Sequence, residues 1–487
     1  MSNEIQKLRL TEKIGYGFGD FASVLFWQSL TMNMMFFYTD VFKIGTAAKA
    51  AAVAGTMIMV SRIFDAVIDP VIGMVADRTE TRWGKFRPFL IWMALPLAIS
   101  AVLTFTTPNL GPTGKIVYAY VTFLMFMACY AGINIPYSSL LGVLTPDPLS
   151  RTSAASFKFA FAYIAGMTVS ATSLIFAKRL GNGIDTSDPG GWQKTMMLYG
   201  AVAVVFFVMT FLFTKERVKP PKAQKTSVGR DLKDLVTNGP WIILLLATIS
   251  MIMFVASRSG VTNYYFKYYI TSFSESGEQM LHYNFLGHSF EWGFAGVTTV
   301  FNTLGQGCAI IGTLLVPLAV NRLGKKTAFL TLFGIAIAST AAFYFLTPNN
   351  LTLIFLLQIT GSLTGGPLSP VIWAMYADTA DYSEWKRGRR ATGLVFSASA
   401  TSQKIGWAIG AYFTGILLSR AGFIADKAQS PEVNKVLIMM MSIIPSAFGI
   451  LSVILVMFYM LNEKKMKIIA SELEARRKAS GQADATV

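Results

Sequence analysis

The chain is poor in charged residues, histidine and cysteine. Charged side chains make up only 14% of its 487 residues, whereas hydrophobic side chains make up 53% and the mean hydropathy is +0.50. Soluble globular proteins carry about 25% charged residues, so the composition excludes that class and indicates an integral membrane protein. Both cysteines, Cys129 and Cys308, fall in apolar stretches, where we expect them to pack as small hydrophobic side chains rather than to bind a metal.

The sequence also lacks the residue combinations of an enzyme active site. No histidine lies in an apolar stretch, and no nucleophile is accompanied by a base at catalytic spacing. His282 and His288 fall in one polar segment without cysteine or clustered carboxylate ligands, so we expect a solvated loop there rather than a metal site. The sequence therefore predicts a protein that is not an enzyme and that has no metal or cofactor site.

Acidic residues are scarce relative to basic ones. The chain has 26 Asp and Glu against 42 Lys and Arg, which gives a formal net charge of +16. Most basic residues fall in segments on one side of the predicted membrane helices, including both chain ends. Because cytoplasmic loops are enriched in Lys and Arg, we expect both termini to face the cytoplasm and the chain to lie in the inner membrane. This distribution explains the charge without nucleic acid as a partner.

Twelve apolar stretches are long enough to cross a bilayer as helices. They fall near residues 15–42, 47–76, 87–107, 116–145, 153–177, 195–214, 240–270, 293–319, 326–347, 350–376, 391–419 and 434–461. A β-barrel would instead show alternating runs of about ten residues. The expected fold is therefore an all-α polytopic membrane protein with twelve transmembrane helices.

A polar segment divides the twelve helices in the middle. It carries Pro220, Pro221 and many basic residues, as a cytoplasmic linker would. Faint similarities between the halves indicate two pseudosymmetric bundles, and such repeats place a substrate site at their interface. The expected organisation is a six-helix bundle over residues 1–214, a linker over 215–239, a second six-helix bundle over 240–461 and a cytoplasmic tail over 462–487.

The second apolar stretch contains two carboxylates. Asp65 and Asp69 share one face of a helix, and Arg62 lies one turn before them. Two ionised carboxylates at this spacing repel by roughly 3 kcal/mol at an effective dielectric of about 20, so a cation must lie between them or one must hold a proton. Such a pair in a membrane helix is typical of a cation or proton site. The alternative is a structural pair that Arg62 neutralises.

The first half contains further polar residues inside its spans. Asp20 and Trp27 lie on one helical stripe, and a carboxylate beside an indole commonly holds a sugar; Asp20 could instead pair with a base of the other half. Asn134 lies beside Pro136, which either frees a backbone carbonyl for a ligand or only bends the helix. Lys158 lies near a helix end, where it could also extend to the membrane surface.

The second half contributes basic residues. Arg258 and Lys404, with Gln403 beside the lysine, lie deep in spans of a half that has no carboxylate within its own spans. They require partners from the first half, so we expect a polar, functional interface between the halves. The tyrosines and Lys267 within residues 264–269 are interpreted as an aromatic belt at the outer membrane surface.

Several stretches together resemble the glycoside–pentoside–hexuronide:cation symporters, the melibiose-carrier group of the major facilitator superfamily. They are GYGFGD with YTDVF, RIFDAVIDPVIGMVADRTETRWGKFRP, NIPYSSL, the YYFKY that follows an arginine, and DYSEWKRGRRATG leading to QKIG. The set covers both halves in the family's order. The resemblance implies alternating access and sugar uptake driven by H+ or Na+.

The resemblance also implies residue roles. Asp65 and Asp69 match the cation-site carboxylates, and Lys404 matches the lysine that pairs with them, to which the helical spacing adds Arg62. Substrate-binding positions fall at Asp20, Asn134, Lys158, Arg258 and Gln403, to which the helical stripe adds Trp27. A gating loop with Asp77, Arg78 and Arg82 would hold the cytoplasmic helix ends together in the outward-facing state.

The chain departs from the family pattern at positions that bear on the ion and the sugar. Ile68 and Ala131 stand where sodium-using members place oxygen ligands, and Val24 and Asn134 stand where melibiose carriers have aspartates. Because Na+ needs several oxygen ligands and a proton needs one carboxylate, we favour H+. The excess of bases favours an acidic sugar such as a uronate or glucuronide, although Arg258 also occurs in members that carry neutral sugars.

Two alternatives are a lysolipid carrier of the same fold and a transporter-like sugar sensor. A lysolipid carrier would need an apolar lateral groove, whereas Asp20, Trp27, Asn134 and Gln403 indicate a polar cavity. A sensor would be expected to carry an added signalling domain, and the sequence shows none. We expect a monomer whose partners are membrane lipid and a small sugar or glycoside.

Overall fold

The computed structural model describes residues 8–45, 49–145, 148–217, 236–273, 279–285, 288–387 and 392–479. Helices dominate, because an apolar chain in lipid satisfies its backbone hydrogen bonds within each helix. The first half contains α1 (Leu10–Phe36), the π-helical turn η1 (Phe37–Val41), α2 (Ala50–Arg78), α3 (Arg87–Trp92), α4 (Ala94–Thr104), α5 (Pro112–Leu144), α6 (Pro148–Leu180) and α7 (Pro189–Phe213).

The second half has the same kind of elements. They are α9 (Gly239–Tyr264), the π-helical turn η2 (Tyr265–Ile270), α10 (Phe294–Leu323), α11 (Lys325–Ala341), the 3-10 turns η3 (Ala342–Phe345) and η4 (Pro348–Asn350), α12 (Leu351–Gly365), α13 (Leu368–Arg387), α14 (Thr392–Arg420), α15 (Pro431–Met441), α16 (Ile443–Met457) and α17 (Glu463–Ala479). Asp188, Asn238 and Ser430 cap α7, α9 and α15 by accepting a hydrogen bond from a first-turn N–H, and a proline follows each cap within two residues.

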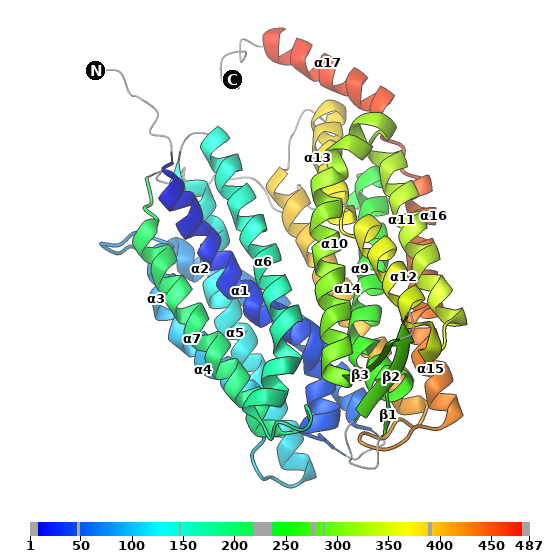
Figure 1. Cartoon of the computed structure of the whole chain (residues 1–487). Helices are drawn as coiled ribbons and strands as arrows, with labels where there is room; N and C mark the ends of the chain where they lie inside the picture. Colours follow the sequence, from blue (N-terminus) through cyan, green and yellow to red (C-terminus); the bar gives the residue numbers. More distant parts are fainter. Residues whose placement is uncertain are drawn as a thin grey trace.

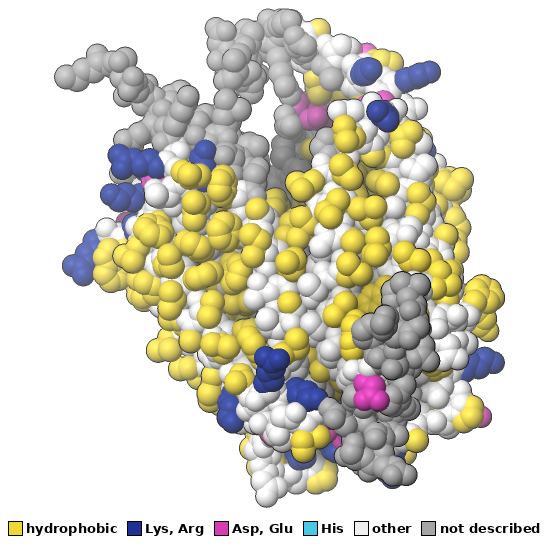
Figure 2. All heavy atoms as spheres, viewed as in Figure 1, with side chains coloured by type: hydrophobic (Ala, Val, Ile, Leu, Met, Phe, Trp, Pro, Cys, Tyr) yellow, Lys and Arg dark blue, Asp and Glu magenta, His cyan; other side chains and the backbone are white. Residues whose placement is uncertain are grey.

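Among the described residues, ten helical segments are long and apolar enough to cross a membrane. α1 and α14, with 27 and 29 residues, contain more polar side chains and complete the twelve predicted spans. Figure 2 shows a broad band of hydrophobic side chains around the middle of the molecule, with Lys and Arg toward its two ends. The predicted all-α polytopic membrane fold is thus confirmed.

A small sheet is the exception to the helical pattern. β1 (Ser272–Phe273), β2 (Gln279–Phe285) and β3 (His288–Gly293) pair antiparallel in that order. The sequence analysis predicted a solvated loop around His282 and His288, and the structure places the backbone of the two histidines in strands β2 and β3. Leu281, Tyr283 and Trp292 line an apolar cavity against α12, so one face of the β2–β3 hairpin has an apolar partner. The side chains of the two histidines lie outside the described part.

The helices form two groups that lie side by side, α1 to α7 and α9 to α16 (Figure 1). α1 packs against α6 and α7, and α9 packs against α14 and α16. Contacts between the groups join α2 to α14, α6 to α10 and α1 to α9. We call the end where α1 begins and α17 lies the near end, and the end where η1 and η2 lie the far end; the groups converge toward the far end. The domain boundaries at residues 214 and 240 stay predictions.

Glycine brings α2 and α14 into close contact. A Cβ on Gly415 would clash with the carbonyl oxygen of Ala51, and a Cβ on Gly55 would lie 3.0 Å from the carbonyl oxygen of Ala411. Small residues at such contacts let membrane helices approach closely. This approach positions the carboxylates of α2 opposite the lysine of α14.

Candidate functional site

The two carboxylates of α2 have different cationic partners. Arg62 Nη1 lies 2.9 Å from Asp65 Oδ2, and its guanidinium lies over the Trp27 ring at 4.8 Å from the ring centroid. Asp69 forms its ion pair with Lys404 of α14, across the two groups. The Asp65 side chain is 3% exposed, whereas those of Asp69 and Lys404 are 28% and 38% exposed. The Asp69–Lys404 pair is therefore the one that solvent and ions can reach.

A second ion pair lies within the first group. The Asp20 carboxylate on α1 is 3.8 Å from Lys158 Nζ on α6, and that ammonium group also lies 5.5 Å from the centroid of the Tyr137 ring. The alternative in which Asp20 pairs with a base of the other half is not what the structure shows. Lys158 has a partner inside the protein.

Trp27 and Asn134 are connected through one tyrosine. The Trp27 indole stacks on Tyr130 with ring centroids 5.7 Å apart, and the Asn134 side chain donates to the Tyr130 carbonyl oxygen at 3.2 Å. Trp27 and Arg62 also line a small cavity of about 50 Å³ together with Trp407 of α14. Gln403 is half-buried beside Lys404, and its side chain makes no hydrogen bond to another described residue.

Arg258 lines a cavity of about 330 Å³ between the two groups. Its Nη2 donates to Gln358 Oε1 at 2.9 Å, and its guanidinium lies 4.9 Å from the centroid of the Phe343 ring. Polar side chains of α1, α6, α10 and α12 line the cavity, among them Gln28, Tyr163, Asn302, Gln306 and Ser362. Arg258 thus differs from Arg62, Lys158 and Lys404 in its partner, which is a neutral amide rather than a carboxylate.

The predicted gating loop lies at the near end. Arg78 and Arg82 are exposed, and Arg82 lies over the ring of its neighbour Trp83 at 5.0 Å. Neither arginine makes an ion pair with another described residue. The side chain of Asp77 lies outside the described part. The following segment is held by Glu216, whose carboxylate accepts hydrogen bonds from three consecutive backbone N–H groups over residues 85–87.

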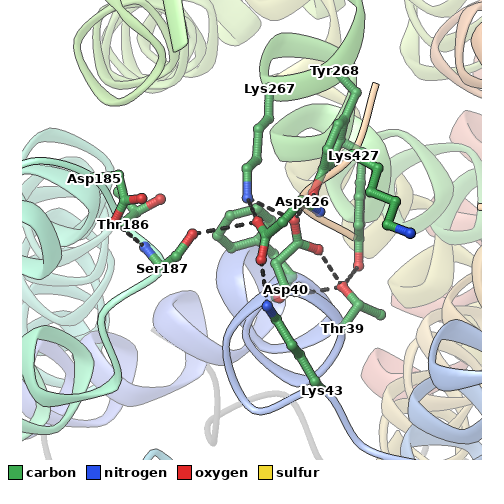
Figure 3. Close-up of polar contacts among 12 residues, drawn as sticks. Thr39, Asp40, Lys43, Asp185, Thr186, Ser187, Lys267, Tyr268, Asp426 and Lys427 are labelled. Atoms are coloured by element: carbon green, nitrogen blue, oxygen red, sulfur yellow. Dashed lines mark hydrogen bonds and ion pairs between the residues drawn. The ribbon is translucent and has the colours of Figure 1, made fainter. Parts of the chain in front are cut away.

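The sequence analysis missed a cluster at the far end, which we call the far-end network (Figure 3). Its ammonium group, Lys267 Nζ on η2, lies 2.8 Å from Asp40 Oδ1 on η1 and 2.9 Å from Asp426 Oδ1 in the loop after α14. Lys43 Nζ lies 2.6 Å from the other Asp426 oxygen. The side chains of Lys267 and Asp40 are 2% and 0% exposed. A buried, charge-paired network therefore joins the two groups at this end.

Tyrosine hydroxyls complete the far-end network. Tyr268 donates to Asp40, and the hydroxyls of Tyr264 and Thr39 are 2.6 Å apart. The aromatic-belt interpretation is wrong for Tyr264, Tyr265 and Tyr268, which are buried. Tyr264 and Tyr268 contact Thr39 and Asp40 of η1, and Tyr265 packs among aromatic rings of its own group, such as Phe343. The signal available in the sequence was the spacing of positions 264, 267 and 268, which share one helical face.

Asp426 lies in the loop after α14, outside the membrane-spanning helices. Partial burial alone would raise the pKa of its carboxyl, but the charges of Lys267 and Lys43 and their hydrogen bonds outweigh that effect. The pKa of Asp426 therefore lies below its ordinary value. Its carboxylate is charged at neutral pH and holds the network together.

Nothing in the described part of the chain groups three or more metal-ligating side chains. The site consists instead of paired charges, aromatic rings and amides distributed over both helix groups.

Comparison with known proteins identifies the family of this chain. Residues 15–463 match the family described as MFS/sugar transport protein. The chain is 33% identical to the inner membrane symporter YicJ of Escherichia coli over 97% of this chain and 96% of that protein. It is 33% identical to the isoprimeverose transporter of Lactiplantibacillus pentosus, covering 94% and 90%, and 30% identical to the glucuronide carrier protein homolog of Escherichia coli, covering 98% of each.

Solved structures show the same fold at low identity. The D-xylose–proton symporter superposes with a TM-score of 0.60 at 13% identity, covering 94% of this chain and 98% of that one. A bacterial homolog of the human lysosomal transporter Spinster gives a TM-score of 0.62 at 14% identity, covering 93% and 98%. The chain belongs to the glycoside–pentoside–hexuronide:cation symporters of the major facilitator superfamily, within the family described as MFS/sugar transport protein.

Proposed function

We propose that this protein imports a sugar or glycoside together with protons by alternating access, as a cation-coupled symporter. The observation that carries the proposal is the ion pair between Asp69 of α2 and Lys404 of α14, which joins the two helix groups and is partly open to solvent. A proton on Asp69 removes its attraction for Lys404. Protonation thereby weakens a contact that links the groups and frees the ammonium group to donate to a sugar oxygen.

A proton suits this site better than Na+. Each carboxylate already faces a basic side chain, Asp65 facing Arg62 and Asp69 facing Lys404. A sodium ion would need several oxygen ligands, whereas the nearby Ile68 and the buried Ala131 offer none from their side chains. The asymmetry between the two pairs favours Asp69 as the group that takes up and releases the proton.

The substrate site lies between the two groups. Asp20, Trp27, Asn134 and Lys158 form its part on the first group, and Arg258 and Gln403 form its part on the second. The polar lining of the cavity beside Arg258 suits a sugar better than a lysolipid chain. The relatives named for isoprimeverose and for glucuronide carry sugars of different charge, so the family alone leaves the charge of the sugar open.

The distribution of basic residues supports a near end, with both termini, in the cytoplasm and a protein in the inner membrane. The far-end network then closes the periplasmic side, and the conformation is inward-facing. Arg78 and Arg82 of the gating loop are exposed, as expected if their contacts form only when the cytoplasmic side closes. We propose that the protein works as a monomer whose two bundles divide at the linker 215–239.

Asp69→Asn tests the proposal. We expect it to abolish uphill accumulation of sugar in vesicles with an imposed pH gradient, while counterflow of labelled against unlabelled sugar continues. Glu432→Gln, which neutralises an exposed acid of α15 outside the site, is the matched control and should accumulate normally. Accumulation by Asp69→Asn at the wild-type level would contradict the role of Asp69. Absence of counterflow in the wild type would contradict transport and would favour a sensor.

A further inference from the structure

We infer that Arg258 is the binding residue for an acidic group on the transported sugar, and that the substrate is a sugar acid with a carboxylate or sulfonate. This inference rests on the proposed function and specifies its substrate. The candidate site holds charged side chains from both helix groups. Three carboxylates, those of Asp20, Asp65 and Asp69, each face one basic side chain. Arg258 is a fourth base there, and no described carboxylate lies within ion-pair distance of it.

The surroundings of Arg258 leave most of its donors without a partner. Its Nη2 donates to the neutral amide of Gln358, while its Nε is buried without any partner among the described residues. Phe343 and Phe301 lie 4.9 and 6.0 Å from the guanidinium carbon and shield it from water. An arginine in a low-dielectric site without a counter-charge is costly. A bound anion would remove that cost by accepting two charge-assisted hydrogen bonds from the guanidinium in a bidentate arrangement.

The cavity has the size and the lining for such a ligand. Its volume of about 330 Å³ falls in the range of small-molecule sites. The amides of Asn302 and Gln306 line it and make no hydrogen bond to another described residue, so they are available to sugar hydroxyls. Gln28 and Tyr163 line it from the first group, so a bound sugar would touch both groups.

The position of Gln358 depends on a glycine of α10. A Cβ on Gly305 would clash with the Gln358 amide nitrogen, so only glycine at 305 allows Gln358 to pack there and hold Arg258. Gln358 is a positioning residue, because it orients the guanidinium, while Arg258 would itself touch the substrate.

The test compares matched pairs of sugars in proteoliposomes. Labelled methyl β-D-glucuronide and methyl β-D-glucoside, and the corresponding galacturonide and galactoside, are offered to the purified full-length protein in counterflow. We expect the wild type to prefer the acidic member of at least one pair. Arg258→Gln should raise the half-saturation concentration of the acidic sugar by roughly 10- to 100-fold, which corresponds to the loss of a hydrogen bond to a charged group. It should change the half-saturation concentration of the neutral sugar by less than about threefold. Arg258→Lys keeps the positive charge but loses the paired N–H groups of the guanidinium. Its half-saturation concentration for the acidic sugar should lie between those of the wild type and of Arg258→Gln.

Controls separate the possible failures. Lys435→Gln removes one exposed positive charge from α15 and should leave both sugars unaffected. If Arg258→Gln fails to fold, Arg258→Lys carries the same comparison. Exchange of neutral sugars without exchange of acidic ones, or an equal loss of both in the Arg258 variants, overturns the anion site while leaving sugar transport intact. Exchange of no sugar by the wild type overturns the proposed function itself.

Discussion

Asp40→Asn should shift the protein from its far-end-closed conformation toward an open one. Asp40 and Lys267 are almost fully buried, and the pair lies 2.8 Å apart. Breaking a buried pair by removing one partner costs roughly 3–5 kcal/mol. Because Asp426 remains 2.9 Å from Lys267, we take the lower end, about 3 kcal/mol. This cost applies only to the closed conformation, because opening exposes Lys267 to water. The equilibrium between the closed and open conformations should therefore shift toward the open one by roughly 100-fold.

The assay measures the distance across the far end. Spin labels are attached to cysteines replacing Ile184 and Ala428, which are exposed on opposite groups, after Cys129 and Cys308 are changed to serine. We expect one short distance in the wild type and a large added population at longer distance in Asp40→Asn.

Two comparison variants make this prediction specific. Lys43→Gln removes an ion pair whose lysine is 56% exposed, so it should shift the equilibrium by less than about fivefold. Asp40→Asn combined with Lys267→Met removes both charges and should restore much of the closed population. Unchanged distances in Asp40→Asn, or a shift in Lys43→Gln of the same size, would refute the assignment of the far-end network as the closing contact.

Two further predictions concern packing and pH. Gly415→Ala should destabilise the protein by roughly 1–3 kcal/mol, because the added Cβ clashes with the Ala51 carbonyl oxygen. Thermal unfolding in detergent should then show a lower midpoint. Gly73→Ala is the control, since a Cβ at Gly73 meets open space, and it should be neutral or slightly stabilising. Since the pKa of Asp426 is lowered in the folded protein, its contribution is complete above its ordinary pKa of about 3.9 and is lost only as pH falls through the lower folded value. The distance across the far end should therefore stay constant from pH 8 to about pH 5, and opening within that range would contradict this.

The sequence predicts the fold well because hydropathy and length determine membrane helices almost without reference to the rest of the chain. The predicted span 47–76 corresponds to α2, and the predicted tail contains α17. The hairpin of β2 and β3 was missed because a six- or seven-residue strand outside the membrane gives no hydropathy signal, and its apolar partner, α12, lies far along the sequence.

Site prediction succeeds for residue types and is incomplete for partners. A carboxylate in an apolar helix is rare and easily recognised in a sequence, so Asp20, Asp65 and Asp69 could be identified as candidates. Which base each one faces depends on helix rotation and on crossings such as that of α2 with α14, which a single sequence does not specify. Lys267 was misinterpreted for the same reason. From the sequence alone, a lysine near a helix end is equally compatible with a surface position and with the centre of a buried network.

The polarity of α1 and α14 has a consequence for how the protein is made. These two helices fall short of the hydropathy that the other spans reach, and each carries a charge well inside it, Asp20 in α1 and Lys404 in α14. A charge at a helix centre opposes entry from the insertion machinery into lipid by roughly 2.5–3.5 kcal/mol. We expect α1 to enter the bilayer fully only after α6 and its Lys158 have been synthesised, whereas α14 follows its partner, α2 with Asp69, along the chain. We therefore expect Asp20 to delay the insertion of α1, and we expect the nascent chain to be most exposed to quality-control proteases before α6 is synthesised.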